Sequence, residues 1–178
     1  MNTRPVRKPT AAILDMDGSL CDTRALAHLV VGCKADWHEF TARARHCPSN
    51  SEALEFAAEQ HRLGRVFVLA TARTEFWRPS TVDWLEEHFP YPVVAQYHRQ
   101  HGDTRRSVDV KRSMYRSIAQ RYDVRAAIDD EHEIADMWSE MGIPVVHRVR
   151  GGVSDLIREA NGGRAPRLPE HVFAPDAV

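Results

Sequence analysis

Short apolar runs alternate along the chain with longer stretches in which apolar residues recur every third or fourth position. The runs cover 11–14, 66–70, 93–95, 124–128 and 145–146. Runs of this length, rich in Val, Ile and Ala, predict short buried strands. Strands separated by helices imply right-handed crossovers. We therefore expect an α/β fold with a Rossmann-like, mostly parallel five-stranded sheet and helices on both faces.

Two of the stretches between runs carry apolar stripes with helical spacing. The stripes are Val110, Met114, Ile118 and Tyr122 in one segment and Ile134, Met137, Trp138 and Met141 in the next. Such stripes are typical of helix faces packed against a core. Gly64 and Gly142 lie where helices should end.

Two sequence pairs have the spacing of a capping box, in which a polar residue begins a helix and an acidic residue follows three positions later. These pairs are Ser49 with Glu52 and Asp130 with Glu133. The spacing predicts helices that begin at Ser49 and at Asp130.

The segment between the first two strands, 19–64, is longer than a simple crossover and predicts helices over 24–31, 35–45 and 52–63. We expect part of it, about 20–50, to form a small helical cap over the site. The predicted organisation is an N-terminal extension over 1–10, one globular domain over 11–150 and a C-terminal tail over 151–178. The tail contains one short predicted helix at 153–160 before a Gly-, Arg- and Pro-rich end.

Composition and charge narrow the class of protein and the partners that it can bind. A chain of 178 residues with 43% hydrophobic and 28% charged residues is typical of one globular domain. Its net charge of −1 excludes a broad cationic surface, so any nucleic-acid contact requires a local basic patch. Cys21, Cys33 and Cys47 form no disulfide or metal-ligand pattern, and no apolar run approaches the roughly 20 residues of a membrane span. We expect a cytoplasmic protein that does not contact the membrane.

The first apolar run ends at two carboxylates, in Asp15-Met16-Asp17-Gly18-Ser19. Residues two apart just after a strand can face one crevice, and Gly18 permits a tight turn. Carboxylate oxygens are ligands that Mg²⁺ prefers. The plainer interpretation is an Asx-type turn at the start of a loop.

Further polar groups follow the other predicted strands. Thr71 and Arg73 follow the second, Lys111 comes after the third, and Asp129-Asp130 ends the fourth. Each has an ordinary explanation as a helix cap or a solvated side chain. Because the carboxyl ends of parallel strands meet at one sheet edge, however, all of them should converge on one crevice.

These motifs, in this order over about residues 11–147, resemble the haloacid dehalogenase superfamily of phosphatases. The resemblance implies that Asp15 is a nucleophile and that Asp17 is a general acid, then the base for the water that cleaves an aspartyl-phosphate. Thr71 would bind a phosphoryl oxygen, and Lys111 would offset the charge of the carboxylates.

The same resemblance implies a Mg²⁺ ion. Its ligands would be a carboxylate oxygen of Asp15, the backbone carbonyl of Asp17 and a carboxylate of Asp129. Asp130 would act nearby as a further catalytic group or through water.

A closer resemblance covers Tyr97 to Trp138, including Gln100-His101-Gly102-Asp103-Thr104-Arg105-Arg106. This stretch is similar to the 3′-phosphatase domain of bacteriophage polynucleotide kinase. That resemblance implies a 3′-phosphorylated nucleic-acid end or nucleotide as substrate, held by Arg73 and by Arg24, Arg105 and Arg106. One departure is Ser107, where the phage domain has an acidic residue; Asp103 or Asp109 could substitute.

Three functions remain in competition. The first is a polynucleotide 3′-phosphatase acting on DNA or RNA, the second is a nucleotidase or other small-molecule phosphatase, and the third is a binding module that has kept the fold without activity. No Gly-x-x-x-x-Gly-Lys-Ser/Thr segment is present, so a phosphate-loop kinase is not encoded here, and a kinase or ligase would be a separate partner. Of the four tryptophans, only Trp77 lies near a predicted site residue as a candidate for base stacking.

Overall fold

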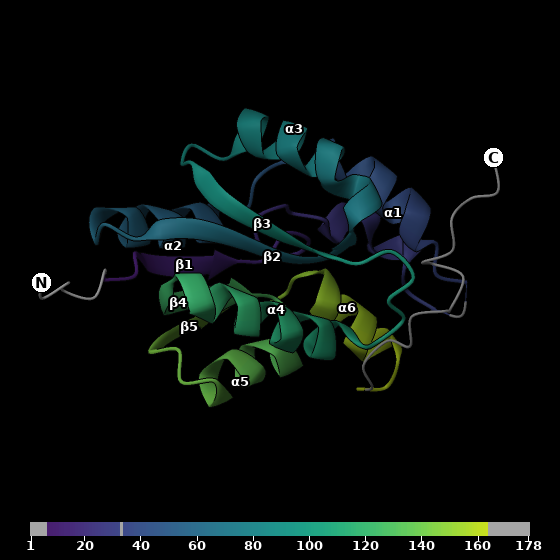
Figure 1. Ribbon diagram of the computed structural model, residues 1–178. Helices are drawn as coiled ribbons and strands as arrows, with labels where there is room; N and C mark the ends of the chain where they lie inside the picture. The colour runs from purple at the N-terminus through teal and green to yellow at the C-terminus, as the bar shows by residue number, and fades with distance from the viewer. Residues whose placement is uncertain (1–6, 33, 164–178) are drawn as a thin grey trace, which may run out of the picture.

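The computed structural model describes residues 7–32 and 34–163, and it contains one five-stranded sheet with strand order β3-β2-β1-β4-β5 (Figure 1). The strands are β1 (Thr10–Leu14), β2 (Val66–Thr74), β3 (Val93–Arg99), β4 (Asp123–Asp129) and β5 (Val145–Arg148). Every neighbouring pair is parallel. The five predicted strands and the Rossmann-like α/β class are confirmed, although β2 and β3 each run four residues beyond their apolar runs.

Helices cover both faces of the sheet, as predicted. They are α1 (Trp37–Ala44), α2 (Ser51–Arg62), α3 (Arg78–His88), α4 (Ser107–Arg121), α5 (His132–Glu140) and α6 (Val153–Ala160), with short 3₁₀ helices η1 (Arg24–Leu29) and η2 (Glu75–Trp77). Helices α4 and α5 lie on one face of the sheet (Figure 1), and α2 and α3 pack against the other. None of the helices within the described ranges has the length and apolarity to cross a membrane.

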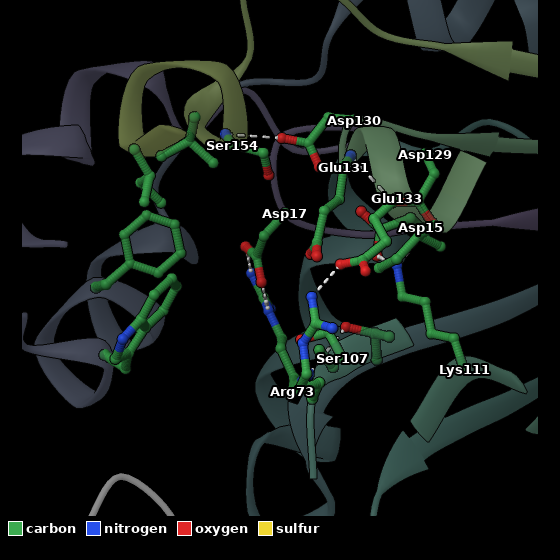
Figure 2. Close-up of a pocket in the computed structure, with 18 of the residues that line it drawn as sticks. Asp15, Asp17, Arg73, Ser107, Lys111, Asp129, Asp130, Glu131, Glu133 and Ser154 are labelled. Carbon is green, nitrogen blue, oxygen red and sulfur yellow. Dashed lines mark hydrogen bonds and ion pairs between the residues drawn. The ribbon is translucent and has the colours of Figure 1, made fainter. Parts of the chain in front are cut away.

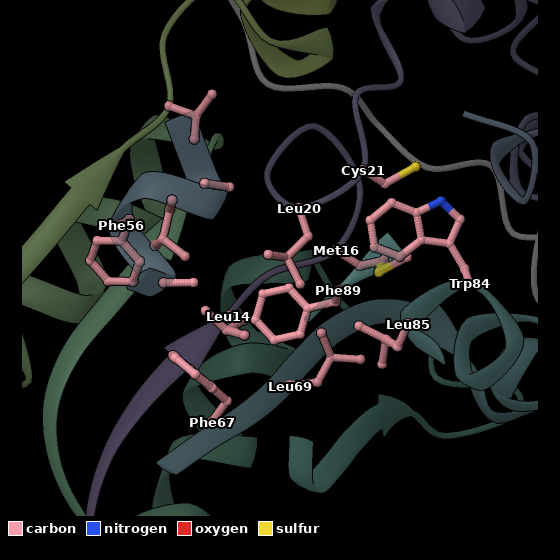
Figure 3. Packing of buried hydrophobic residues seen from close by; sticks show 14 of the residues in the cluster. Leu14, Met16, Leu20, Cys21, Phe56, Phe67, Leu69, Trp84, Leu85 and Phe89 are labelled. Carbon is pink, nitrogen blue, oxygen red and sulfur yellow. The ribbon is translucent and has the colours of Figure 1, made fainter. Parts of the chain in front are cut away.

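The alternation of side chains in β1 explains why its sequence is apolar throughout. Ala12 and Leu14 pack in the cluster that contains α2 and α3, and Ala11 and Ile13 pack in the one that contains α4 and α5. A strand buried on both faces has no solvated side to carry polar residues. Figure 3 shows the first cluster, where Leu14 lies among side chains from β2 and α3.

Both capping-box predictions are wrong. Helix α2 is capped by Asn50, whose side chain accepts a hydrogen bond from the backbone N–H of Glu52 at 3.1 Å, while Ser49 forms a β-bridge with Cys21. Helix α5 begins after Glu131 without a side-chain cap. Asp130 accepts a hydrogen bond from the backbone N–H of Ser154, 24 residues along the chain. A long-range contact has therefore replaced the local one in each case.

The short helix predicted at 153–160 is confirmed as α6, and it packs against the rest of the molecule. Val153 and Ile157 of α6 are buried in a small cluster with Val30 and Phe40, against which Trp37 packs. Helix α6 thereby joins the segment between β1 and α2 and forms one side of the molecule beside the strand ends. The remainder of the predicted tail, 164–178, lies outside the described residues, as do residues 1–6 of the N-terminal extension and Cys33.

Candidate active site

The carboxyl ends of β1, β2 and β4 open into a cavity of about 940 Å³ (Figure 2). Asp15, Asp17, Thr71, Arg73, Lys111, Asp129 and Asp130 all line it. The prediction that these residues converge at one sheet edge is therefore confirmed. Residues of α1, α4, α5 and α6 complete the walls.

Asp15 is fixed through both carboxylate oxygens at the end of β1. Its Oδ1 accepts a hydrogen bond from Lys111 Nζ at 2.6 Å, and its Oδ2 accepts one from Ser19 Oγ at 2.9 Å. Its backbone N–H donates to the carbonyl of Ile128 on β4. The hydroxyl of Ser19 thus helps to fix the orientation of the Asp15 carboxylate. A carboxylate held in this way is oriented before any ligand arrives.

Lys111 links the first and fourth strands. Besides Asp15, its Nζ contacts Asp129 Oδ2 at 2.7 Å, and the indole N–H of Trp138 donates to the same oxygen at 3.2 Å. Burial alone would lower the pKa of Lys111, but Asp129 and Asp15 outweigh it and the pKa is raised. Lys111 is therefore a permanent positive charge, 2% exposed, between two carboxylates.

Asp17 is held by Arg73 rather than left free. Arg73 Nε and Nη2 donate to the two oxygens of Asp17 at 2.7 and 2.6 Å, and Nη1 donates to Thr81 Oγ1 at 3.1 Å. The pKa of Arg73 is lowered by burial but raised more by Asp17, so the net shift is upward. Thr71, 1% exposed, accepts a hydrogen bond from the backbone N–H of Arg73. The strand end thereby fixes the hydroxyl of Thr71 and the position of Asp17 together.

Three carboxylates gather where a cation would bind. Oxygens of Asp15, Asp129 and Asp130 lie within 4.8 Å of one another, and all three residues are buried. Burial, with the nearby negative charge of Asp15, raises the pKa of Asp130 well above its ordinary value, and burial also raises that of Asp129. Lys111 is the cation in contact with this trio, so negative charge is in excess. A small divalent cation with oxygen ligands fits both the charge and the donor set.

The lining of the cavity as a whole also carries more negatively than positively charged side chains. Among its described lining residues, carboxylates outnumber Lys and Arg side chains by eight to five. A phosphate would be repelled by such a lining unless a metal ion supplied further positive charge. This supports the expected Mg²⁺.

The acidic trio fits only because glycine occupies position 18. Gly18 has φ +82°, and a Cβ built on it would lie 2.1 Å from Asp130 Oδ2. Gly152 approaches the same carboxylate from α6, with a built Cβ at 3.0 Å. Asp130 therefore sits in a slot between two backbone segments.

We predict that Gly18→Ala lowers phosphatase activity by about 100-fold or more, because displacing Asp130 misplaces the charge around Asp15 by an ångström or more. The measurement is kcat/KM for an aryl phosphate over a Mg²⁺ titration. Gly102→Ala is the matched control, since Gly102 also has positive φ, at +75°, but no atom within 4 Å of its built Cβ. Equal activity of the Gly18 and Gly102 variants would contradict the role of the slot.

Of the predicted substrate-binding residues Arg24, Arg105 and Arg106, the structure brings two to the cavity. Arg105 and Arg106 line the cavity, where Arg105 pairs with Asp103 and Arg106 with Glu133. Arg24 does not line it: its side chain is 59% exposed and pairs with Asp22. The structure therefore does not bring Arg24 to the site. Its spacing after Asp17 gave no information on the direction of the loop.

Several residues that line or support the cavity were not predicted from the sequence. Glu131 and Glu133 line the cavity, whereas Asp103 and Asp109, suggested as substitutes at Ser107, do not. Arg99 is fully buried and donates hydrogen bonds to the carbonyls of Ala72, Asp103 and Arg105 and to the Ser107 hydroxyl. It ties the end of β2 to the loop before α4. An arginine at the end of a buried strand was the available signal.

The fold and the ordered site define a phosphatase of the haloacid dehalogenase superfamily. More specifically, residues 9–152 match the sequence model of the polynucleotide kinase PNKP phosphatase domain, and the chain belongs to that family.

Solved structures agree on the fold. A chain of a Pnkp1/Rnl/Hen1 complex is 22% identical with a TM-score of 0.64, and the match covers 80% of this chain and 45% of that one. A chain of the Pnkp1/Rnl/Hen1 RNA repair complex is 19% identical with a TM-score of 0.62, covering 83% and 45%. A class C acid phosphatase from Bacillus anthracis with tungstate bound is 12% identical with a TM-score of 0.58, covering 82% and 69%. The present chain thus spans less than half the length of the two repair-complex chains.

Proposed function

We propose that the protein is a Mg²⁺-dependent phosphomonoesterase that removes 3′-phosphates from DNA or RNA ends through an aspartyl-phosphate on Asp15. The observation that carries this proposal is the buried Asp15–Lys111–Asp129 contact in a chain of the PNKP phosphatase family. It supplies a rigidly held carboxylate whose charge is partly offset by Lys111 beside the cavity.

In the first step a carboxylate oxygen of Asp15 forms a bond to phosphorus, and the bond from phosphorus to the leaving 3′-oxygen breaks. Asp17 gives that oxygen a proton. In the second step water attacks the phosphorus of the aspartyl-phosphate, Asp17 takes the proton of the water, and inorganic phosphate leaves with Asp15 restored. Thr71 would donate its hydroxyl hydrogen to a phosphoryl oxygen.

Mg²⁺ would be held by Asp15, by the backbone carbonyl of Asp17 and by the acidic pair, and when bound it neutralises charge on both the nucleophile and the phosphate. We assign the direct contact from the acidic pair to Asp130 as well as the predicted Asp129. Asp129 already accepts hydrogen bonds from Lys111, from Trp138 and from the Glu131 backbone N–H. Asp130 accepts one from Ser154, which leaves it more lone pairs for a cation.

We propose for Arg73 a role other than the predicted binding of substrate. All its contacts in the described structure go to Asp17, to Thr81 and to the hydroxyl of Thr71, so we propose that it positions Asp17. An arginine N–H donates hydrogen bonds and cannot accept one from a protonated carboxyl oxygen. For Asp17 to act as an acid, one of the two contacts with Arg73 must therefore lengthen when the proton arrives.

The second candidate function is a nucleotidase. Its supporting observation is the excess of carboxylates over cations in the cavity, which suits a small substrate better than a polyanion. A separate kinase or ligase as partner remains a proposal that rests on the two Pnkp1/Rnl/Hen1 structures.

The test is phosphate release, with Mg²⁺ and with EDTA, from a 3′-phosphorylated oligonucleotide, its 5′-phosphorylated counterpart and a panel of mononucleotides. We expect metal-dependent release from the 3′-phosphorylated oligonucleotide at least tenfold faster than from the others. Preference for mononucleotides would replace the first function by the second. Release that continues in EDTA would contradict the metal site.

A further inference from the structure

The cavity is much larger than a phosphoryl group requires, and its two sides differ in character. At about 940 Å³ it lies near the upper end of the ~300–1,000 Å³ typical of ligand pockets. Figure 2 shows the carboxylates on one side of Asp17 and aromatic and aliphatic side chains on the other. Five apolar lining residues, which we call the aromatic wall, lie together: Trp37 packs with Phe40, Val153 and Ile157, and the ring of Trp77 contacts that of His38 beside Trp37.

The aromatic wall contains the two tryptophans that are not fully buried. Trp84 and Trp138 are at most 1% exposed and lie among core side chains, whereas Trp37 and Trp77 are half-buried and border the cavity. The expectation that Trp77 lies near the site is confirmed, and Trp37 was not expected there. A tryptophan with an accessible face on a cavity offers a flat, polarizable surface.

Trp77 is tied to the catalytic residues by hydrogen bonds. Its backbone carbonyl accepts hydrogen bonds from Ser80 Oγ at 3.1 Å and Thr81 Oγ1 at 2.8 Å. Thr81 in turn accepts a hydrogen bond from Arg73, which also donates to Asp17. The position of the Trp77 backbone is thereby fixed relative to the group that handles the leaving oxygen.

Trp37 reaches the cavity from the insert between β1 and α2. Asp36 caps its helix by accepting from the Glu39 N–H at 2.8 Å, and the ring of Trp37 packs edge-on against Phe40 with centroids 5.6 Å apart. The neighbouring His38 ring lies 5.0 Å from that of Trp77, which closes the gap between α1 and η2. The indole N–H of Trp37 is out of reach of water and has no hydrogen-bond partner among the described residues.

We infer that the aromatic wall binds the base of the terminal nucleotide by stacking, an inference that rests on the proposed function. The wall and the phosphoryl-transfer residues share one cavity, so a ligand on the wall is joined to the reacting phosphate by a spacer of sugar size. A nucleobase has the planar face that tryptophan stacks on. The wall therefore selects a nucleotide over a sugar phosphate, and it does so with little regard to base identity.

The experiment compares two 3′-phosphorylated oligonucleotides that differ only at the terminal residue, one with a base and one with a tetrahydrofuran abasic analogue. We expect kcat/KM for the base-bearing end to be about 5- to 150-fold higher, the range that stacking of one base supplies. Trp77→Ala and Trp37→Ala should each reduce this ratio severalfold, and Trp77→Phe should keep most of it.

The matched control is Phe76→Ala. Phe76 is 68% exposed, adjoins Trp77 and does not line the cavity, so its loss should leave the ratio between the two substrates unchanged. The same comparison of binding, by calorimetry on Asp15→Asn with Mg²⁺, gives the ratio without turnover.

The outcomes separate the two proposals. Equal kcat/KM and equal binding of the two ends would overturn the stacking inference while leaving the phosphatase assignment intact. A base preference that survives both Trp→Ala changes would place base recognition elsewhere and overturn it as well. No release from either end, combined with base-dependent binding to Asp15→Asn, would contradict the proposed reaction and support the aromatic wall.

Discussion

Asp15→Asn should lower metal-dependent phosphate release by roughly 10⁴- to 10⁶-fold, the scale on which removal of a catalytic group is felt in a well-organised site. The amide keeps the shape of the carboxylate but is not a nucleophile of useful strength, and it cannot restore a free carboxylate after hydrolysis. The measurement is single-turnover and steady-state release from a 3′-phosphorylated oligonucleotide. A phosphoprotein trapped by acid quench of the unmodified protein, absent in the variant, would locate the covalent step.

The control for that change is Asp22→Asn. Asp22 follows the same turn and pairs with the exposed Arg24 outside the cavity, so its activity should stay within about twofold of the original. If Asp15→Asn kept more than about one-tenth of the activity, the nucleophile would have to be another residue.

Lys111→Met should reduce the free energy of unfolding by about 3–5 kcal/mol, the usual result of removing one partner from a buried ion pair. The change leaves Asp15 and Asp129 facing each other without the cation that touches both. Because Mg²⁺ supplies positive charge to the same carboxylates, we expect millimolar Mg²⁺ to recover part of the loss in the variant and to stabilise the unmodified protein less. Urea unfolding with Mg²⁺ and with EDTA measures both effects.

Lys34→Met is the matched control, because Lys34 is exposed and a surface change of this kind stays within about 0.5 kcal/mol. If the Lys111 and Lys34 variants unfolded at the same urea concentration in EDTA, the result would contradict the prediction that Lys111 offsets repulsion between the buried carboxylates.

The architecture was accessible to sequence reasoning where the local pattern and the global fold agree. The inner strands β1 and β2 are largely buried on both faces, so the apolar runs at 11–14 and 66–70 are uninterrupted. Thr71 and the acidic pair lie at strand ends that parallel topology brings together, and Lys111 lies on the helix that follows β3. What failed depended on contacts distant in sequence. Asp130 matched a helix cap in spacing, but Ser154 claims its side chain, and no local pattern reports on a residue 24 positions away.

The parts of the site that were missed come from elements whose direction the sequence does not encode. Arg24 carries the expected charge, but a 3₁₀ helix turns it to solvent, where Asp22 is the nearer partner. Trp37 lies on a helix face whose sequence pattern is typical of core packing, and its packing beside α6 places it at the cavity. Both depend on how the insert between β1 and α2 folds back.

The hydrogen bond from Ser154 to Asp130 sets an order of events during synthesis. The site draws on residues from Asp15 to Ser154, and the central strand β1 pairs with β4, which is made more than 100 residues later. A nascent chain released only as far as β5 would have its sheet but neither the donor that holds Asp130 nor the side chains of α6 that close the aromatic wall. Activity should therefore appear late, when α6 has left the ribosome, and a single proteolytic cut between β5 and α6 should silence an otherwise folded protein.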